Sequence, residues 1–367
     1  MRIFFSAGEA SGDAYAAELA KSIRALEPAA ELEGLGGHRS RSAGIRTVVD
    51  TSTWGAIGIT QALRVVPRAI GGYFKGMRAL GHGEPGVFVP IDFGWVNIRF
   101  ARKAKQLGWK VLYFVPPGSW RKDRQGADLP VLCDEIVTPF PWSAEILTKM
   151  GASAHFFGHP LKEMVAHAKD EPRIPGRIAV LPGSRRSEVE LNLAVIAQTL
   201  KPSDTAEFAV APSVEVEALK AAWSRIAPGR FDIFTQNDTY GVFKRAEAAI
   251  VCSGTATLEG VLCGCPMVVI YKLAKATEIE ARLLMGKKIE FISLPNILLG
   301  RKVVEELIQD AATPEAIRNH LDRLRADTEE RRAMLAAFSE LNETLGPGDA
   351  ISRAAQLIVA LARRPKS

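Results

Sequence analysis

The chain has 367 residues, 47% of them hydrophobic and 24% charged, so it is long enough for two α/β domains of similar size. No apolar run approaches the 18 residues that a membrane-spanning helix needs. The apolar run at the N-terminus is too short for the hydrophobic region of a signal peptide. The net charge of +6 suits an anionic partner, such as a phosphorylated substrate or an anionic membrane face. Nucleic acid is not expected, because no basic motif is interleaved with aromatic residues.

The cysteines do not have the spacing of a redox or zinc motif. The chain has four cysteines, namely Cys133, Cys252, Cys263 and Cys265. Three of them lie in or near apolar, strand-like runs, where cysteine usually behaves as a small hydrophobic residue. One residue separates Cys263 from Cys265, and no histidine pair lies nearby. We therefore expect buried, reduced thiols, a cytoplasmic protein and no metal site.

Short apolar runs alternate with helical patterns in the first half of the chain. The predicted strands are Arg2–Ser6, Gly86–Ile91, Lys110–Val115 and Glu135–Thr138. The predicted helices include Asp13–Leu26, Ile98–Leu107 and Ser143–Met150. This alternation predicts a parallel sheet covered by helices on both faces.

A charged segment with two prolines, Lys169–Pro175, interrupts this pattern and predicts a linker. Further strands are predicted at Arg177–Leu181, Glu207–Ala211, Phe231–Phe234, Ala248–Cys252 and Met267–Tyr271. After about residue 313 the chain reads as helical. We predict two Rossmann-like α/β domains, 1–168 and 176–345, that face each other across a ligand-binding cleft, and a helix in 346–367 that crosses back to the first domain.

The segment Ile57–Leu80 mixes large apolar residues with arginine and lysine. Such a mixture suits an element that lies on an anionic lipid surface. A helical hairpin that covers the sheet is an equally good interpretation. Pro67, Gly71 and Gly72 argue against one continuous helix.

The first strand runs into a turn of small residues, Ser6–Asp13. Gly8, Ser11 and Gly12 would let the backbone approach a ligand at the start of the next helix. Glu9 and Asp13 would repel a phosphate, so a tight turn with Ser11 or Asp13 as helix cap remains an alternative.

Asp92 follows the strand that ends at Ile91. A carboxylate at the carboxyl end of a central strand projects toward a ligand, and partial burial can raise its pKa into the range of a general base. A helix-capping or surface role is the alternative. The loop within Tyr113–Arg124 carries Trp120 and several basic residues, which suit a phosphorylated acceptor or simple packing.

The stretch Leu181–Glu188 predicts an anion site. Gly183 frees the turn after a strand, Ser184 can donate a hydrogen bond, and the Arg185 guanidinium matches phosphate oxygens. The alternative is a solvated arginine pair beside a capped helix.

A similar strand-turn-helix junction occurs at Val251–Glu259. Ser253, Gly254 and Thr255 offer amide and hydroxyl donors, and Glu259 can accept hydrogen bonds from a ribose diol. Together with Gly183–Arg185, this junction describes a nucleoside diphosphate site better than a single anion site.

The last candidate stretch is Ser293–Asn296, followed by a predicted helix that carries Glu305, Glu306 and Gln309. The side chains of Asn296 and Gln309 suit the reading of hydroxyls and base edges. On their own these residues would be ordinary loop and surface residues.

Taken together, these motifs resemble those of lipid-A-disaccharide synthase, a family of GT-B glycosyltransferases. The matching segments are Ala7–Asp13, Gly36–Arg39, Trp54–Ile59, Ile91-Asp92, Phe157–Pro160, Leu181–Arg185, Ser253–Glu259, Cys265–Val269 and Ser293–Asn296. They run along nearly the whole chain, and AGEASGD, LPGSR and SLPN in this order are highly specific together.

The resemblance implies transfer of 2,3-diacylglucosamine from its UDP-activated form to 2,3-diacylglucosamine 1-phosphate. The implied enzyme inverts the anomeric centre, uses no metal or other cofactor, and works as a cytoplasmic, peripheral protein at the inner membrane; a homodimer is one option for its assembly. The family's pattern makes Asp92 the base for the acceptor 6-hydroxyl and Arg185 the group that stabilises the leaving diphosphate. It assigns Glu259 to ribose and places Asn296, Glu306 and Gln309 on the nucleotide side.

The sequence departs from the family on the acceptor side. Trp95 stands where the family usually has a second acid, and Val115–Arg121 replaces an aromatic acceptor loop. Three alternatives therefore stay open: a related transferase with another acceptor, a UDP-N-acetylglucosamine 2-epimerase, and a UDP-sugar or lipid-binding protein without activity.

Overall fold

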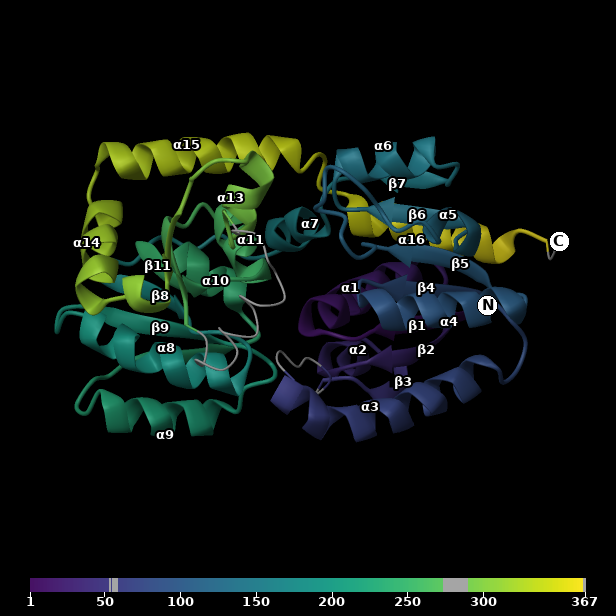
Figure 1. Ribbon diagram of the computed structural model, residues 1–367, viewed down its shortest axis with the longest axis horizontal. Helices are drawn as coiled ribbons and strands as arrows, with labels where there is room; N and C mark the ends of the chain where they lie inside the picture. The colour runs from purple at the N-terminus through teal and green to yellow at the C-terminus, as the bar shows by residue number, and fades with distance from the viewer. Residues whose placement is uncertain (53, 55–58, 273–289, 366–367) are drawn as a thin grey trace. The chain divides into compact units, whose positions relative to one another are not determined.

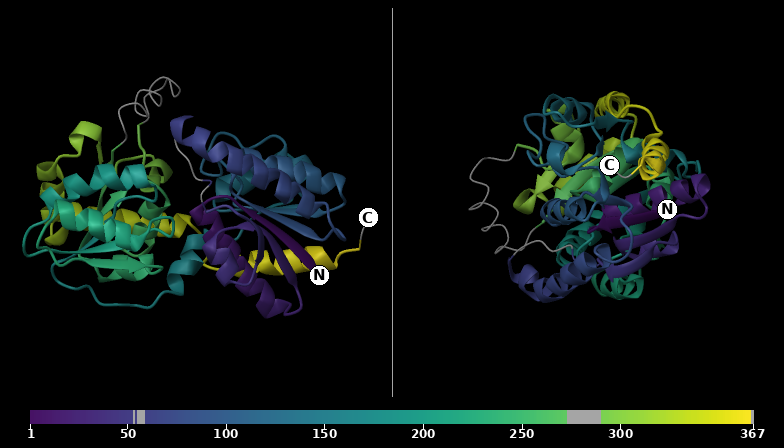
Figure 2. Two further views of the ribbon diagram at one scale, coloured as in Figure 1. Left: turned by 90° about the horizontal axis from the view of Figure 1, so that it is seen from below. Right: turned by 90° about the vertical axis from the view of Figure 1, so that its right-hand side faces the viewer.

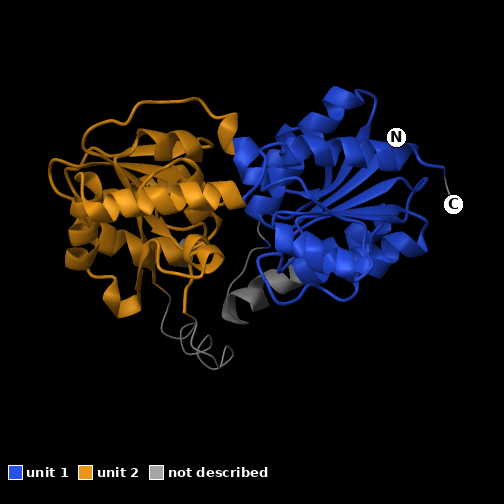
Figure 3. Cartoon of the chain, turned by 90° about the horizontal axis from the view of Figure 1, so that it is seen from above, with its two compact units in different colours: residues 1–164, 345–367 blue, residues 165–344 orange. Residues whose placement is uncertain are grey.

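The computed structural model describes residues 1–52, 54, 59–272 and 290–365. The chain divides into two compact units (Figure 3). Unit 1 comprises residues 1–164 and 345–367, and unit 2 comprises residues 165–344. Each unit is built on its own parallel sheet with helices packed on it, which confirms the predicted α/β class.

Unit 1 contains a seven-stranded parallel sheet with the order β3-β2-β1-β4-β5-β6-β7 (Figure 1). Its strands are β1 Arg2–Ala7, β2 Glu31–Gly36, β3 Arg46–Asp50, β4 Val87–Ile91, β5 Lys110–Phe114, β6 Glu135–Thr138 and β7 Ala154–Phe156. The predicted strands correspond to β1, β4, β5 and β6, which form the apolar centre of the sheet. Because β1 and β4 are parallel neighbours, the turns that follow them lie side by side at the carboxyl ends of the strands.

The strand β2 was not predicted, because its sequence ELEGLG alternates acids with glycine and leucine. In the structure Glu33 is buried and forms an ion pair with Arg2, at 2.6 Å, and with Arg46. The two arginines thus neutralise Glu33, whose charge would otherwise argue against a position in a buried strand.

The helices of unit 1 are α1 Ala10–Leu26, α2 His38–Ser42, α3 Ile59–Leu80, α4 Gly94–Gln106, α5 Leu129–Leu132, α6 Pro141–Lys149 and α16 Ala350–Arg363, and α7 Pro160–Ala166 spans the boundary with unit 2. Helices α3 and α4 cover one face of the sheet, and α1 and α16 cover the other (Figure 2). Glu163 fixes the start of α16, since its buried carboxylate accepts a hydrogen bond of 2.6 Å from the Ile351 amide.

The segment predicted as an interfacial element or hairpin is one helix, α3, so the predicted break at Pro67, Gly71 and Gly72 is wrong. Ile57 lies outside the described residues. Gly72 has a packing reason within this helix, because a Cβ at this position would overlap the Trp54 indole. In the later part of α3, where the structure describes the side chains, Ile70 is 51% and Phe74 66% exposed.

Unit 2 contains a six-stranded parallel sheet with the order β10-β9-β8-β11-β12-β13. Its strands are β8 Arg177–Leu181, β9 Thr205–Val210, β10 Ile233–Gln236, β11 Ala248–Cys252, β12 Met267–Tyr271 and β13 Glu305–Ile308. Its helices include α8 Arg186–Thr199, α9 Val216–Ile226, α10 Thr239–Arg245, α11 Thr255–Leu262, α13 Leu294–Leu299, α14 Pro314–Arg325 and α15 Glu329–Thr344. In the described part of the chain, no helix has both the length and the apolar character to cross a bilayer.

Two predictions for unit 2 need correction. Glu305 and Glu306 are not helical; they open the edge strand β13, which pairs with β12, and Gln309 begins a 3-10 turn, Gln309–Ala311. A strand was predicted at Phe231–Phe234, but β10 starts at Ile233, and the Phe231 side chain is 95% exposed.

Candidate functional site

Asp92 lies in a turn with unusual backbone geometry between β4 and α4. Asp92 and Phe93 both adopt positive φ, at 46° and 52°. Neither is glycine, so this conformation is costly and needs support from the surrounding structure. Most of that support comes from the side chain of Asn97, on the first turns of α4.

Asn97 is fully buried, and its amide joins the ends of the two strands β1 and β4 to the turn that follows β4. Its Nδ2 donates to the carbonyl oxygens of Ser6, Ile91 and Asp92 at 3.0, 3.1 and 3.0 Å, and its Oδ1 accepts from Ser6 Oγ at 2.5 Å. Tyr113 Oη also donates to the Asp92 carbonyl, at 2.8 Å. The main chain of Asp92 is therefore fixed, which sets the direction of its side chain.

The carboxyl group of Asp92 has the electrostatic properties of a general base. Burial, and then the negative charge of Glu9, raises the pKa of Asp92 to about 6, against the opposing effect of a hydrogen bond from the Phe93 amide. A carboxylate with this pKa is ionised at neutral pH and is a stronger base than an exposed aspartate. Burial and the charge of Asp92 raise the pKa of Tyr113, so its hydroxyl remains a donor.

The first turn of the chain packs directly beneath this site. A Cβ at Gly8 would overlap the Phe93 ring, whose centroid lies 5.8 Å from that of Trp54. Helix α1 begins at Ala10 with Glu9 as N-cap, so the predicted caps Ser11 and Asp13 lie inside the helix. Gly8 therefore allows close packing against Phe93; its predicted role in the approach of a ligand stays a prediction.

Asp13 is a structural acid. Its buried carboxylate accepts hydrogen bonds from the amides of Gly37 at 2.7 Å and Arg39 at 2.9 Å, and also from Ser40. It therefore ties α1 to the start of α2. Ser11 is partly exposed on α1, whereas Gly12 is buried, and a Cβ at Gly12 would lie 3.6 Å from the Ile91 carbonyl oxygen.

Three tryptophans follow the neighbouring strands β4, β5 and β6, and each has a cation over its ring. Arg99 lies 3.5 Å from the Trp95 centroid, Arg121 5.9 Å from that of Trp120, and Lys122 5.0 Å from that of Trp142. Trp95 is 69% and Trp120 47% exposed. Aromatic rings paired with basic side chains can contact a sugar that carries a phosphate; the prediction of an acceptor site concerned the loop that carries Trp120, and it stays a prediction.

The loop that carries Trp120 is well anchored. Val115, at its start, has a positive φ of 53°. Trp142 Nε1 donates to the Ser119 carbonyl at 3.0 Å, and Ser143 Oγ donates to Gln125 Oε1 at 3.0 Å. The loop is therefore held by helix α6 on one side.

In unit 2 the predicted anion loop lies between β8 and α8. Gly183 has a φ of 125°, and Arg185 is the N-cap residue of α8. The loop lies next to the end of β11, since a Cβ at Gly183 would come within 3.6 Å of Cys252 Sγ. The Arg185 guanidinium is bound by Glu188, with 2.8 Å between Nη1 and Oε1, a partner that sequence reasoning missed.

The second predicted phosphate turn follows β11. Gly254 has a φ of 149°, and α11 starts at Thr255, so Glu259 lies on its second turn as predicted. Ser253 Oγ donates to the Ile292 carbonyl at 2.8 Å. The hydroxyl therefore joins this turn to the segment that contains Asn296.

Glu306, which is partly buried, forms one hydrogen-bonded cluster with the buried side chains of Ser293 and Asn296. Glu306 Oε1 accepts from the Ser293 amide, from Ser293 Oγ and from Asn296 Nδ2, at 2.9, 2.5 and 2.8 Å. Asn296 Oδ1 accepts from the amides of Val303 and Val304, at 2.7 and 2.9 Å. These bonds shape the segment 292–296, so the two residues hold it in place. Gln309 lies at the end of β13, where its carbonyl accepts from Lys272 Nζ at 3.0 Å.

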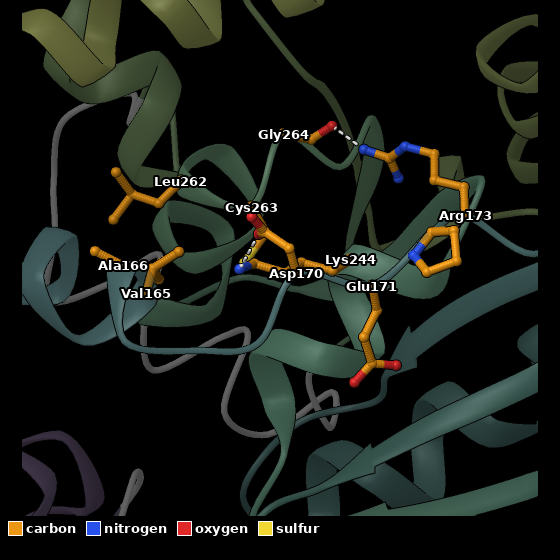
Figure 4. A pocket seen from close by; sticks show the side chains of 10 residues that line it. Val165, Ala166, Asp170, Glu171, Arg173, Lys244, Leu262, Cys263 and Gly264 are labelled. Atoms are coloured by element: carbon orange, nitrogen blue, oxygen red, sulfur yellow. Dashed lines mark hydrogen bonds and ion pairs between the residues drawn. The ribbon is translucent and has the colours of Figure 1, made fainter.

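A cavity of about 770 Å³ lies elsewhere in unit 2 (Figure 4). It contains none of the predicted site residues, and several of its charged groups bind one another, the main chain or Arg245. Lys244 Nζ lies 2.9 Å from Asp170, and Arg173 donates to the Gly264 carbonyl. These contacts fasten the predicted linker segment to unit 2. Among the residues that the structure describes, no three His, Cys, Asp or Glu side chains form a metal-binding group.

Comparison with known proteins identifies the family. The family model "Lipid-A-disaccharide synthetase" matches residues 3–357. The lipid-A-disaccharide synthase of Trichlorobacter lovleyi is 32% identical over 377 residues, which cover 98% of this chain and 97% of that protein. The synthase of Myxococcus xanthus is also 32% identical, over 382 residues, with 98% and 97% coverage.

Solved structures share the fold at low identity. The Acinetobacter baumannii MurG structure matches with a TM-score of 0.54 and 14% identity, covering 98% of this chain and 99% of that one. A UDP-GlcNAc 2-epimerase from Neisseria meningitidis matches with a TM-score of 0.58 and 12% identity, covering 98% of this chain and 99% of that one. Because transferases and epimerases share this architecture, the fold alone does not separate them. The sequence match does, and the chain belongs to the lipid-A-disaccharide synthase family of GT-B glycosyltransferases.

Proposed function

We propose that the protein transfers 2,3-diacylglucosamine from UDP to the 6-hydroxyl of 2,3-diacylglucosamine 1-phosphate, with inversion and without a metal. The observation that carries this proposal is Asp92, a fixed carboxylate with a pKa raised to about 6, in a chain whose relatives are named lipid-A-disaccharide synthases. Inversion requires one base and a stabilised leaving group, and Asp92 and Arg185 are suited to these roles.

In the proposed step Asp92 accepts the proton of the acceptor 6-hydroxyl. The hydroxyl oxygen forms a bond to the anomeric carbon of the donor, and the bond from that carbon to the UDP oxygen breaks. UDP leaves with the electron pair, and the Arg185 guanidinium and the turn at Ser253–Thr255 offset its charge. The proton stays on Asp92 until solvent removes it.

The nucleotide side is proposed to use unit 2. Structures with the same fold include Arabidopsis UGT89C1 complexed with UDP and a Methanocaldococcus jannaschii epimerase in complex with UDP-GlcNAc and UDP. Glu259 is proposed to hold the ribose hydroxyls, and Gln309 to contact the nucleotide. Asn296 and Glu306 contribute by shaping segment 292–296 beside Ser253.

The acceptor side is proposed to work at the inner-membrane surface, where its acylated substrates are held. Ile70 and Phe74 expose apolar side chains on α3, and Lys75 and Arg78 are exposed nearby. This combination is typical of an element that rests on anionic lipid. A different acceptor remains the second candidate, because exposed Trp95 stands where the family usually has an acid.

The test offers UDP-2,3-diacylglucosamine and 2,3-diacylglucosamine 1-phosphate to the purified protein and measures disaccharide and UDP. Formation of both in equal amounts is the expected result. UDP release without disaccharide would support another acceptor, and UDP binding without turnover would support the inactive binding protein. Asp92→Asn should abolish transfer and spare UDP binding, whereas Arg185→Ala should weaken both.

A further inference from the structure

The β8–α8 loop already holds an anion from its own chain. Glu188 Oε2 accepts hydrogen bonds from the amides of Ser184 and Arg185, both at 3.3 Å, and Oε1 accepts from Arg185 Nη1 at 2.8 Å. Of these donors, the Arg185 guanidinium is the one that the sequence predicts for a phosphate, and the two amides belong to the same predicted anion loop. Glu188 therefore occupies hydrogen-bonding positions that a diphosphate would need.

The carboxylate of Glu188 is built into this position. Its side chain is 7% exposed, and that of Arg185 is 26% exposed. A Cβ at Gly183 would come within 2.8 Å of Glu188 Cβ and 2.9 Å of Oε2, so only glycine lets the loop close around this side chain. The Glu188 charge also contributes, after burial, to the raised pKa of Cys252 and of Tyr271.

Helix capping explains part of this arrangement. A glutamate three residues after the N-cap accepts the N-cap amide in an ordinary capping box, and glutamine does the same. Capping does not require a charge, a bond from the Ser184 amide or an ion pair with the Arg185 guanidinium. The negative charge thus needs a second reason.

We propose that Glu188 is an internal competitor of the donor diphosphate: its carboxylate weakens the binding of UDP at the Gly183–Arg185 loop and so speeds the release of UDP after transfer. This inference rests on the proposed function. The amide hydrogen bonds, at 3.3 Å, are long, so the amides can turn to a phosphate oxygen. The carboxylate remains close to the incoming phosphate and repels it, because little solvent separates the two charges.

The test measures the Kd for UDP by calorimetry for the wild type, Glu188→Gln and Glu190→Gln. Glu188→Gln keeps a capping acceptor and removes the charge, so UDP should bind about tenfold more tightly. Glu190 is exposed on the same helix, and its substitution changes the net charge equally, so its Kd should stay within about twofold. The Kd for uridine, which has no phosphate, should be the same in all three proteins when it is measured directly.

Turnover gives a second readout. In Glu188→Gln, KM for the donor should fall, inhibition by UDP should become stronger, and kcat should fall if UDP release limits the rate. Glu188→Asp keeps the charge but withdraws it by one carbon, and it should also bind UDP more tightly than the wild type. Glu188→Asp replaces Glu188→Gln in this test if Glu188→Gln does not fold.

The outcomes separate this inference from the proposed function. If the wild type binds UDP and the folded Glu188 variants bind it no more tightly, the competition is wrong and Glu188 only caps α8. If the wild type binds no UDP and the Glu188 variants do, competition is supported in a stronger form. If none of them binds UDP, both the inference and the proposed function fail.

Discussion

Asn97 Nδ2 lies 3.0 Å from the carbonyl oxygen of Asp92, and this hydrogen bond helps to hold two successive residues at positive φ. The same amide binds the ends of β1 and β4 through Ser6 and Ile91. Through this arrangement, the sheet itself fixes the proposed base. Asn97 is a positioning residue, since its contacts are to the main chain of Asp92.

Asn97→Ala should therefore affect catalysis and stability together. Asn97→Ala removes the donor to the carbonyl groups of Ser6, Ile91 and Asp92 and leaves the Asp92 carbonyl with Tyr113 Oη. This loss of buried hydrogen bonds should lower the free energy of unfolding by about 2 to 4 kcal/mol. The Asp92 side chain should also lose its direction, so kcat should fall more than the donor KM changes. Urea unfolding and steady-state kinetics measure the two effects; a stable variant with unchanged kcat would contradict the positioning role.

The pH dependence of the rate should report the ionisation of Asp92. Since the pKa of this group is raised to about 6, the rate should rise with pH through about 6 and then level off. A rate measured as kcat/KM between pH 5 and 8 tests this. A profile that is flat down to pH 5 would show that a group with an ordinary pKa is the base.

The same pKa has a consequence for stability, with a definite sign. The folded pKa of about 6 lies above the ordinary aspartate value of 3.8, so folding favours the protonated form of Asp92. The free energy of unfolding should then fall as the pH rises from about 4 to 6, by at most roughly 3 kcal/mol. Asp92→Asn removes this cost, and its gain in the free energy of unfolding should be larger at pH 7 than at pH 4.5. Equal gains at both values would contradict the raised pKa.

Much of the fold could be predicted because central strands of a parallel sheet are apolar along their whole length. The predictions failed where a tertiary partner overrides the local pattern. Glu33 is buried in β2 because Arg2 and Arg46 lie beside it. Glu305 and Glu306 read as helical, yet they extend the sheet beside β12.

The sequence predicts where the candidate site residues lie along the strands better than it predicts their hydrogen-bond partners. Strand ends and turns marked Asp92, Arg185 and Ser253, because ligand sites gather at the carboxyl ends of parallel strands. The hydrogen-bond partner of Ser253 lies 39 residues away along the chain, beyond any local pattern. The contact between Glu188 and Arg185 is local, since the spacing of three residues is that of a capping box, and this contact could have been predicted from the sequence.

Glu306→Gln should disturb segment 292–296. An amide group places a donor where either the Ile292 amide or the Ser293 groups now donate, so one hydrogen bond should be lost and the free energy of unfolding should fall by about 1 to 3 kcal/mol. The Kd for UDP should rise, because Ser253 binds Ile292 and would lose its support. The neighbouring Glu305→Gln is the matched control, since Glu305 lies 2.6 Å from Lys302 and 3.7 Å from His320, outside the cluster of Ser293 and Asn296. Weaker UDP binding at full stability would instead indicate direct contact with the nucleotide.

Trp95 should decide the choice of acceptor. Its ring is 69% exposed, three residues after Asp92, and carries Arg99 on one face. The indole and the guanidinium there can contact a sugar ring that carries a phosphate, and an aspartate at this position would remove the ring surface and draw the guanidinium to itself. Trp95→Asp should therefore raise KM for the phosphorylated acceptor about tenfold and leave the Kd for UDP unchanged. Phe231→Ala, which removes another exposed ring, from unit 2, should change neither value. If Trp95→Asp leaves KM for the acceptor unchanged, the ring does not contact it, and the acceptor must be recognised by the Trp120 loop instead.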